Sequence, residues 1–377
     1  MAEHEYPGRA APQPIADCDV HEGMRSITEL LPYLPPQWHM YFNRDSLSRL
    51  PAKHPYLHPQ GGTRLDLIHP DNSSDDMFPD RVREQLLDRY GITCAMLVGT
   101  YVHQFTAMPQ GKFAAALATA YNDWLIDRWL SFDPRFKGSV AVAAQEPQLA
   151  AQEIDRVGGH PSMVQVNLPM PSPQLPWGHE RYYPIWEAAV RNNLRVAMHV
   201  SPPAGLLGAP SVHGWATSYM ELRCQYVLQF QSGLLSLVCN GVFERFPELR
   251  IVLLEGGFSW VPGLMWRLDQ SWGALRREVP WLKRPPSEYV REHVRFGTQP
   301  MEEPPDPKHL LQLVDMMGSD RMLMFATDYP HWDFDDPGPA IPKRLPADLR
   351  RKILWDNARD FYGFPEPAQT SPSAVAV

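Results

Sequence analysis

The sequence has few cysteines, and none of them are spaced to bind a metal or to staple a small domain. Its 377 residues include four, Cys18, Cys94, Cys224 and Cys239. They fall mainly within apolar segments and form no CxxC pair. We therefore expect reduced thiols in the core of a cytoplasmic protein, and not the disulfide framework of a secreted one.

Long apolar runs and an excess of positive charge are also missing. No uninterrupted apolar stretch reaches the length that spans a bilayer, and the N-terminal segment MAEHEYPGRAAPQP lacks the apolar region of a signal peptide. The formal net charge is -8, with 35 basic residues spread among 43 acidic ones. These features predict a soluble cytoplasmic protein that binds neither membranes nor nucleic acid.

No GxGxxG or GxxxxGK motif follows any apolar run, which disfavours a doubly wound nucleotide-binding sheet. The chain instead contains a series of short β-rich runs bounded by turn residues. They occupy residues 15–21, 94–100, 136–145, 162–168, 195–201, 249–257, 293–299 and 321–330. Amphipathic helical patterns separate them. Eight such alternations predict an α/β fold, a (β/α)₈ TIM barrel whose parallel strands are buried on both faces.

One connection is far longer than the others. Residues 22–80 separate the first expected strand from the first long helical pattern, and loops of this length inside a compact domain are usually functional. We expect a lid over the barrel mouth, with a packing insertion or an oligomer contact as the alternative. The barrel domain is predicted at 15–362, with flexible segments at 1–14 and 363–377.

Ligand-type residues stand at the ends of three expected strands. In a TIM barrel the carboxyl ends of the strands line the active-site mouth. The stretch DCDVHEG ends the first run, and the alternation of side chains along a strand predicts that Asp17, Asp19 and His21 point the same way. His199 and Asp328 end the fifth and eighth runs.

Two imidazoles and two carboxylates from these ends would form a coordination shell for Zn²⁺ or Mn²⁺ that leaves one position open for a water. We expect one divalent metal ion per chain. Its predicted ligands are Asp19, His21, His199 and Asp328.

The combined motifs resemble the amidohydrolase-related family. DxDxH, MHVSPP, FPELRIVLLEGGFSWVPGLMWRLD and MLMFATDYPH stand on the first, fifth, sixth and eighth expected strands. They are similar to the branch that includes aminocarboxymuconate semialdehyde decarboxylase and the metal-dependent benzoate decarboxylases. The resemblance covers residues 15 to 362 and implies a single divalent metal at the barrel mouth.

Carried over by position, the family's HxH pair falls on Asp19 and His21, so the first ligand is a carboxylate here. The family's remaining ligands fall on His199 and on Asp328, which also relays protons in the family. A strand-6 histidine that many members use as acid or base falls on Glu255. We expect Asp328 and Glu255 to be the catalytic residues, with Glu255 alternatively held in a structural role by a neighbour such as Arg267.

Further polar and aromatic residues near the expected mouth complete the predicted site. Substrate contacts are predicted for His103, Gln165, Asn167, Thr298 and Trp332. Roles in supporting the ligands are predicted for Asp17, Arg267 and His331.

The carboxylate at position 255 decides which reaction the sequence favours. A second carboxylate beside a metal-activated water predicts a hydrolase that acts on a small, cyclic or aromatic carbonyl substrate. The alternative is the non-oxidative decarboxylation of an aromatic or unsaturated carboxylic acid, which wants a cationic or neutral group where Glu255 stands. A metal-free binding protein on the same barrel is the second alternative. Exposed tryptophans and base rates predict a homodimer or higher homo-oligomer.

Overall fold

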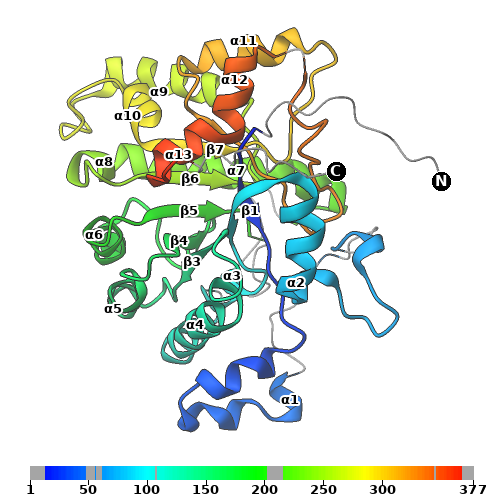
Figure 1. Cartoon of the computed structure of the whole chain (residues 1–377). Helices are drawn as coiled ribbons and strands as arrows, with labels where there is room; N and C mark the ends of the chain where they lie inside the picture. The colour runs from blue at the N-terminus through cyan, green and yellow to red at the C-terminus, as the bar shows by residue number, and fades with distance from the viewer. Residues whose placement is uncertain are drawn as a thin grey trace, which may run out of the picture.

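The computed structural model describes residues 13–47, 56, 62–106, 108–201, 215–343 and 345–366. Eight parallel strands follow one another around a barrel in chain order. They are β1 (Ile15–Val20), β2 (Ile92–Leu97), β3 (Phe136–Ala141), β4 (Met163–Pro169), β5 (Arg195–His199), β6 (Ile251–Leu254), β7 (Val294–Gly297) and β8 (Leu323–Met324). The predicted TIM barrel is confirmed (Figure 1).

The ring closes between the first and the last strand. The Cys18 amide donates to the Phe325 carbonyl at 2.9 Å, and Val20 forms a parallel bridge with Tyr329. The observed β8 is much shorter than the expected strand, because the chain beyond Met324 pairs with β1 only through separate hydrogen bonds, such as that from the Asp328 amide to the Asp19 carbonyl at 3.0 Å. Asp328 therefore lies in an irregular segment and not on a strand.

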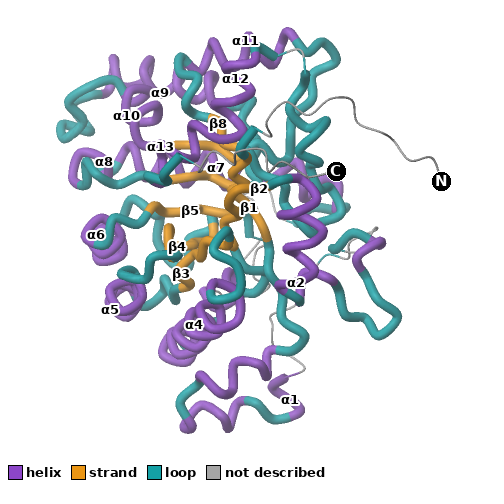
Figure 2. Tube along the Cα trace, viewed as in Figure 1, coloured by secondary structure: helices purple, strands orange, loops and turns teal. Residues whose placement is uncertain are grey.

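Helices surround the strands, as the purple tube segments around the orange core show (Figure 2). The α-helices are α1 (Arg44–Leu47), α2 (Pro79–Val82), α3 (Val102–Thr106), α4 (Gly111–Leu125), α5 (Pro147–Val157), α6 (Tyr183–Arg191), α7 (Tyr219–Cys239), α8 (Val242–Arg245), α9 (Val261–Leu275), α10 (Pro286–His293), α11 (Lys308–Met317), α12 (Ala347–Arg351) and α13 (Asn357–Tyr362). Short 3₁₀ segments are η1 (Ile27–Tyr33), η2 (Pro36–Tyr41), η3 (Leu65–Leu67), η4 (Asp75–Met77) and η7 (Glu180–Tyr182), and π-helical turns are η5 (Arg83–Asp88), η6 (Ile126–Leu130) and η8 (Lys352–Asp356).

Two apolar layers hold the barrel together. The larger one lies between the strands and the surrounding helices. The smaller one fills the barrel interior with alternate residues of β1, β2, β5, β6 and β8, and side chains of η8 and α13 close its lower end. Cys18 and Cys94 belong to this interior, as expected for core thiols. The prediction is wrong for Cys224, which is exposed because it lies on the outer face of α7.

The long insertion after β1 divides into two parts. In the first, η1 packs against α4, and the Tyr33 hydroxyl donates to Asp127 on η6 at 2.6 Å. In the second, Gly62 accepts a hydrogen bond from the Trp332 amide at 3.2 Å, and Thr63 bridges to His331. Residues 62 and 63 thus lie beside the segment that follows Asp328, and the lid role of the insertion stays a prediction. Residues 48–55 and 57–61, like most of the predicted terminal segments, lie outside the described residues.

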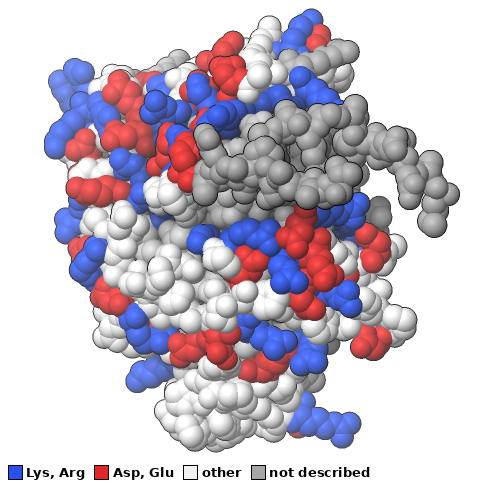
Figure 3. All heavy atoms as spheres, viewed as in Figure 1, with Lys and Arg blue, Asp and Glu red and all other residues white. Residues whose placement is uncertain are grey.

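The surface carries both signs of charge. On the face shown in Figure 3, lysine and arginine side chains are interspersed with aspartate and glutamate. Within the described part of the chain, no helix has both the length and the apolar character needed to cross a membrane.

Candidate metal centre and active site

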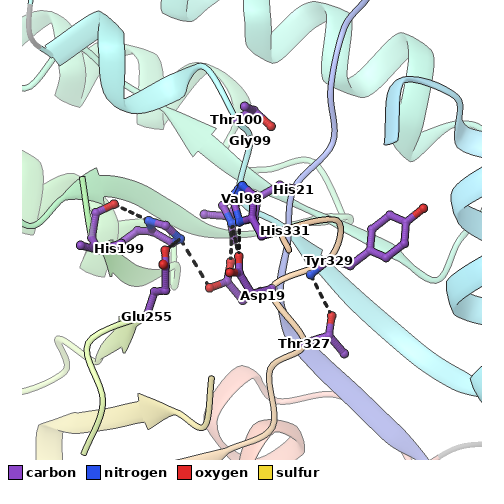
Figure 4. Close-up of polar contacts among 12 residues, drawn as sticks. Asp19, His21, Val98, Gly99, Thr100, His199, Glu255, Thr327, Tyr329 and His331 are labelled. Carbon is purple, nitrogen blue, oxygen red and sulfur yellow. Dashed lines mark hydrogen bonds and ion pairs between the residues drawn. The ribbon is translucent and has the colours of Figure 1, made fainter. Parts of the chain in front are cut away.

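The four predicted metal ligands converge at the barrel mouth. Asp19 and His21 come from the end of β1, and His199 comes from the end of β5 (Figure 4). Asp328 lies in the segment after β8. All four side chains are buried, and each offers a ligand atom within 4.8 Å of the others.

The donor atoms of this cluster lack hydrogen-bond partners among the described residues. Both carboxylate oxygens of Asp19, both ring nitrogens of His21, Nε2 of His199 and Oδ2 of Asp328 are buried without one. A buried polar atom left unsatisfied costs about 1–3 kcal/mol. Two imidazole nitrogens and two carboxylates form a donor set that suits a divalent ion such as Zn²⁺ or Mn²⁺. The residues present therefore fit one bound metal ion.

The backbone orients His199 as a ligand. Its Nδ1 donates a hydrogen bond to the Val200 carbonyl, so in the neutral ring Nε2 carries the free lone pair. Nε2 lies 3.5 Å from Asp19 Oδ2 and 3.5 Å from Glu255 Oε2. His21 Nε2 lies 3.0 Å from Asp328 Oδ1 and 3.3 Å from Asp19 Oδ1. Both imidazoles therefore face the same small volume.

The charges of the cluster shift one another's pKa values. Burial lowers the pKa of His21, but Asp19 and then Asp328 outweigh it and raise the pKa above its usual value. The pKa of His199 is likewise raised, by Asp19 and Glu255 against burial. Burial raises the pKa of Asp328, yet His331 and His21 hold it well below its usual range. A metal ion that binds below these raised pKa values displaces protons from the two histidines.

The alternation of side chains along a strand predicts that Asp17 points the same way as Asp19. In the structure Asp17 does not point into the mouth. The pairing of β1 with β2 slips by one residue between Asp17 and Val20, which is a β-bulge. Asp17 instead accepts hydrogen bonds from the amide of Thr327 at 2.9 Å and from its hydroxyl at 2.6 Å. Burial raises the pKa of Asp17 to about 7. Asp17 thereby ties β1 to the segment that carries Asp328.

Both predicted catalytic residues have left-handed backbones. The φ angle is +61° at Glu255 and +58° at Asp328. Such conformations are uncommon for residues other than glycine and cost of order 1–3 kcal/mol, and they cluster at functional sites. The backbone here turns each carboxylate toward the mouth, directly after β6 at Glu255 and in the irregular segment after β8 at Asp328.

Glu255 is held by Arg223, and not by Arg267 as predicted. Arg223 on α7 contacts Glu255 with one guanidinium nitrogen and Asp333 with the other. Arg267 lies on the exposed face of α9. The carboxylates of Glu255 and Asp333 raise the pKa of Arg223 despite its burial. Burial and then Asp328 raise the pKa of Glu255, although Arg223 opposes them.

Arg223 is the main site residue that the sequence reasoning missed. Helices of a TIM barrel run antiparallel to the strands, so the first turn of each helix lies at the mouth. Arg223 stands near the start of α7 (Tyr219–Cys239), the helix after β5. A search for cations near the start of each helix could have found Arg223, but the sequence does not reveal that it bridges two carboxylates.

His331 supports Asp328, as predicted. Its Nδ1 lies 2.6 Å from Asp328 Oδ1. Its side chain is 28% exposed, whereas the Asp328 side chain is fully buried. His331 thus connects a buried carboxylate with the cavity.

A cavity of about 170 Å³ opens above the cluster. This is close to the roughly 150 Å³ of an engineered cavity that binds benzene, so it suits a single aromatic ring. The lining includes His103, Trp332, Tyr219 and Tyr226. The first two are predicted substrate contacts, and the two tyrosines were missed because they stand on α7 and not at the end of a strand.

Three other predicted substrate contacts lie outside the cavity lining. Gln165 bonds to the Ser139 and Tyr362 hydroxyls low in the barrel, since β4 continues to Pro169. Thr298 accepts a hydrogen bond from the Ala326 amide at 3.2 Å. The structure therefore places neither side chain in the cavity, because Gln165 stands lower on β4 and the Thr298 hydroxyl faces the segment after β8.

Asn167 also lies behind the cavity wall, but it contacts a lining residue. Its Oδ1 is 2.9 Å from His103 Nε2. The His103 ring packs on that of His199, with centroids 4.9 Å apart. Burial lowers the pKa of His103 to about 3, so the ring is neutral.

Sequence relatives of this chain include decarboxylases of an aromatic acid. A gamma-resorcylate decarboxylase of Polaromonas sp. (strain JS666) is 25% identical over 305 residues, covering 74% of this chain and 86% of the relative. The enzyme of the same name from Rhodococcus jostii (strain RHA1) is 26% identical over 274 residues, covering 66% of this chain and 76% of the relative.

Solved structures share the fold. An amidohydrolase from Mycobacterium avium subsp. paratuberculosis K-10 superposes with a TM-score of 0.72 at 19% identity, over 95% of this chain and all of that one. A dihydroxybenzoic acid decarboxylase from Polaromonas sp. JS666, with bound manganese and the inhibitor 2-nitroresorcinol, superposes with a TM-score of 0.63 at 21% identity, over 93% of this chain and 97% of that one.

These findings overturn the prediction of a hydrolase. The relatives are decarboxylases, so they favour the decarboxylase alternative. The physical objection to that alternative was the negative charge of Glu255 at the mouth. Arg223 removes the objection because it places a cation against this carboxylate. The alternative of a metal-free binding protein is likewise set aside, since the relatives are enzymes.

The family is shown by a match that covers most of the barrel. The family model described as Amidohydrolase matches residues 80–364, which is more than half of the chain. The matched part holds His199, Glu255 and Asp328, and the motifs of Asp19 and His21 precede it. The chain therefore belongs to the Amidohydrolase family, as a TIM-barrel enzyme of its aminocarboxymuconate semialdehyde decarboxylase-like branch.

Proposed function

We propose that this protein catalyses the non-oxidative decarboxylation of a small hydroxylated aromatic carboxylic acid, with one Mn²⁺ bound by Asp19, His21, His199 and Asp328. The observation that carries the proposal is the cluster of unpartnered buried donor atoms beneath a cavity of about 170 Å³. The gamma-resorcylate decarboxylase relatives support the reaction class. Two carboxylate ligands and the manganese-containing decarboxylase of similar fold favour Mn²⁺ over Zn²⁺.

The bound metal would supply a positive centre that orients the substrate carboxylate and a neighbouring oxygen. Loss of CO₂ from an aromatic ring requires that a proton be delivered to the ring carbon that carried the carboxylate. Asp328 lies at the cluster, and its pKa is held low by His331 and His21. A proton placed on this carboxyl group is therefore strongly acidic and transfers readily to carbon.

His331 is the group that can return the proton to Asp328. Its Nδ1 bonds to Asp328 Oδ1, and its ring borders the cavity. Arg223 pairs with both Glu255 and Asp333, and its positive charge offsets part of the negative charge that would oppose the entry of a substrate anion. Trp332, which is 37% exposed, provides an aromatic face at the edge of the cavity.

Released CO₂ tests the reaction directly. The Mn²⁺-loaded protein is incubated with a panel of mono- and dihydroxybenzoates, and CO₂ and the phenol product are measured. Asp328→Asn should lower kcat by about 10³-fold or more, because it removes both a ligand and the proton donor. A matched control is Asp315→Asn on the exposed part of α11, which should leave the rate unchanged. No CO₂ from any member of the panel contradicts the proposal.

Two further expectations stay predictions. A homodimer or higher homo-oligomer is supported by exposed tryptophans such as Trp266 and Trp281, which are 56% and 46% exposed. Light scattering on the purified protein measures the assembly. The cytoplasmic location rests on the cysteine usage, and fractionation of the producing cell tests it.

A further inference from the structure

His103 presents an imidazole to the cavity and has no part in holding the metal cluster. It lies on the short helix α3 after β2, and its side chain is largely buried. The ring lines the cavity and packs nearly parallel to that of His199, at an interplanar angle of 22°. It is therefore held beside the place where a substrate group would meet the metal.

A chain of hydrogen bonds decides which nitrogen of His103 carries its proton. The Asn167 amide nitrogen donates to the Val98 carbonyl, and this fixes the orientation of the side-chain amide. Asn167 Oδ1 consequently faces His103 Nε2 at 2.9 Å. An amide oxygen can only accept, so Nε2 must be the donor.

The other ring nitrogen is then a bare acceptor. A neutral imidazole has one N–H and one lone pair, so Nδ1 of His103 carries the lone pair. Among the described residues Nδ1 has no hydrogen-bond partner. It is also not fully buried, in contrast to the unpartnered donor atoms of the metal cluster. Nδ1 is thus open toward the cavity and needs a donor on whatever fills it.

We propose that His103 is a specificity-determining residue, whose Nδ1 accepts a hydrogen bond from a hydroxyl group of the aromatic substrate. The inference rests on the proposed function and adds the residue that reads the ring substituent. A carboxylate, an ether or a halogen offers no proton to this lone pair and leaves it unsatisfied. Because the ring stacks on His199, the recognised hydroxyl lies close to the carboxylate that is lost.

Paired ligands test the hydrogen bond. Calorimetry on the Mn²⁺-loaded protein compares 2,6-dihydroxybenzoate with 2-fluoro-6-hydroxybenzoate, in which fluorine replaces one donor with little change in shape. The unmodified protein should bind the dihydroxy acid about 10- to 100-fold more tightly. His103→Phe keeps a stacking ring without the acceptor, and the preference should fall to about 3-fold or less. His103→Leu provides a second variant without the acceptor.

The control is His309→Phe, which makes the same substitution at an exposed position on α11 and should keep the full preference. Equal binding of the two acids by the unmodified protein, no binding of either, or a preference that survives in both His103 variants would overturn the proposal.

A second measurement reads the tautomer without turnover. The ¹⁵N chemical shifts of imidazole distinguish a protonated from a bare ring nitrogen, and the His103 signals are assigned by their loss in His103→Phe. We expect a bare Nδ1 and a protonated Nε2 in the metal-free and in the Zn²⁺-loaded protein. A protonated Nδ1 overturns the proposal.

The two proposals fail in different ways. Hydroxyl preference without release of CO₂ leaves the assignment of His103 standing and removes decarboxylation. Release of CO₂ with the same preference in His103→Phe and in the unmodified protein removes the role of His103 and leaves decarboxylation standing.

Discussion

The ion pairs of Arg223 allow one prediction to be worked out in detail. In Arg223→Met the apolar stem is largely kept, but the cation between Glu255 and Asp333 is lost. The side chains of Arg223, Glu255 and Asp333 are 19%, 7% and 16% exposed, so solvent screens this arrangement only weakly. The substitution leaves two carboxylates at the mouth without their counterion.

The expected loss follows from the burial. Opposite charges in contact attract by about 4 kcal/mol at an effective dielectric constant of about 20, and breaking a buried pair typically costs about 3–5 kcal/mol. The cavity admits water to one side of the pair. We therefore expect the free energy of unfolding at pH 8 to fall by about 3 kcal/mol.

The loss should depend on pH with a defined sign. Burial raises the pKa of Glu255 and of Asp333 in the folded protein, and removal of Arg223 raises both pKa values further. An acid whose folded pKa lies above its unfolded pKa is destabilising when ionised, because the folded state binds the proton more tightly. The destabilisation is therefore full above the raised pKa values and shrinks as the pH falls through them toward the unfolded values of about 4.

Urea unfolding at pH 5 and pH 8, in the presence of a chelator, measures the effect. The double variant Arg223→Met/Glu255→Gln should recover part of the loss at pH 8, since one of the stranded charges is gone. Arg267→Met on the exposed face of α9 is the matched control and should change the stability by no more than about 0.5 kcal/mol. A loss below about 1 kcal/mol, or an equal loss at both pH values, would refute the electrostatic reasoning.

Three further predictions concern the metal centre and its support. His331→Phe should weaken Mn²⁺ binding by about 10- to 100-fold, because Asp328 loses the hydrogen bond that orients it; titration with a competing chelator measures this, and unchanged affinity contradicts it. Mn²⁺ affinity should rise with pH up to the raised pKa values of His21 and His199 and level off above them, since the metal needs neutral imidazoles. Calorimetry in buffers of different ionisation enthalpy measures the protons released on binding, and binding without proton release at pH 6 would contradict the prediction. Burial raises the pKa of Asp17 to about 7, so its ionisation should make the metal-free protein less stable as the pH rises from about 4 to 7, and Asp17→Asn should lack this contribution. Melting midpoints of both proteins across that range measure it, and the same dependence of the midpoint on pH in both would contradict it.

The local order of the chain could be read from the sequence because it depends on local patterns. Apolar runs bounded by turn residues, alternating with amphipathic segments, require a parallel sheet covered on both faces, and eight of them close into a barrel. Barrel geometry also places every strand end at the same mouth. That rule was enough to gather Asp19, His21, His199 and Asp328, and the structure brings their donor atoms together.

The tertiary structure determined which side chains surround the four metal ligands. The β-bulge after Asp17 interrupts the alternation that a regular strand would have, and it depends on how β1 pairs with β2. The length of β4 decides that Gln165 stays below the mouth while Asn167 reaches the ring of His103. Such effects depend on depth and pairing, which a one-dimensional pattern does not contain.

The choice of reaction also needed contacts between distant parts of the chain. From the sequence, Glu255 is an unpaired carboxylate at the mouth, and that reading favoured hydrolysis. Arg223 is 32 positions away in sequence and reaches Glu255 only because the N-terminal end of α7 lies at the mouth. The sequence by itself determined the barrel, the ligand types and the ends at which they stand. Only the fold determined the charge that surrounds them, because electrostatic energy depends on distance in space and on exclusion of water.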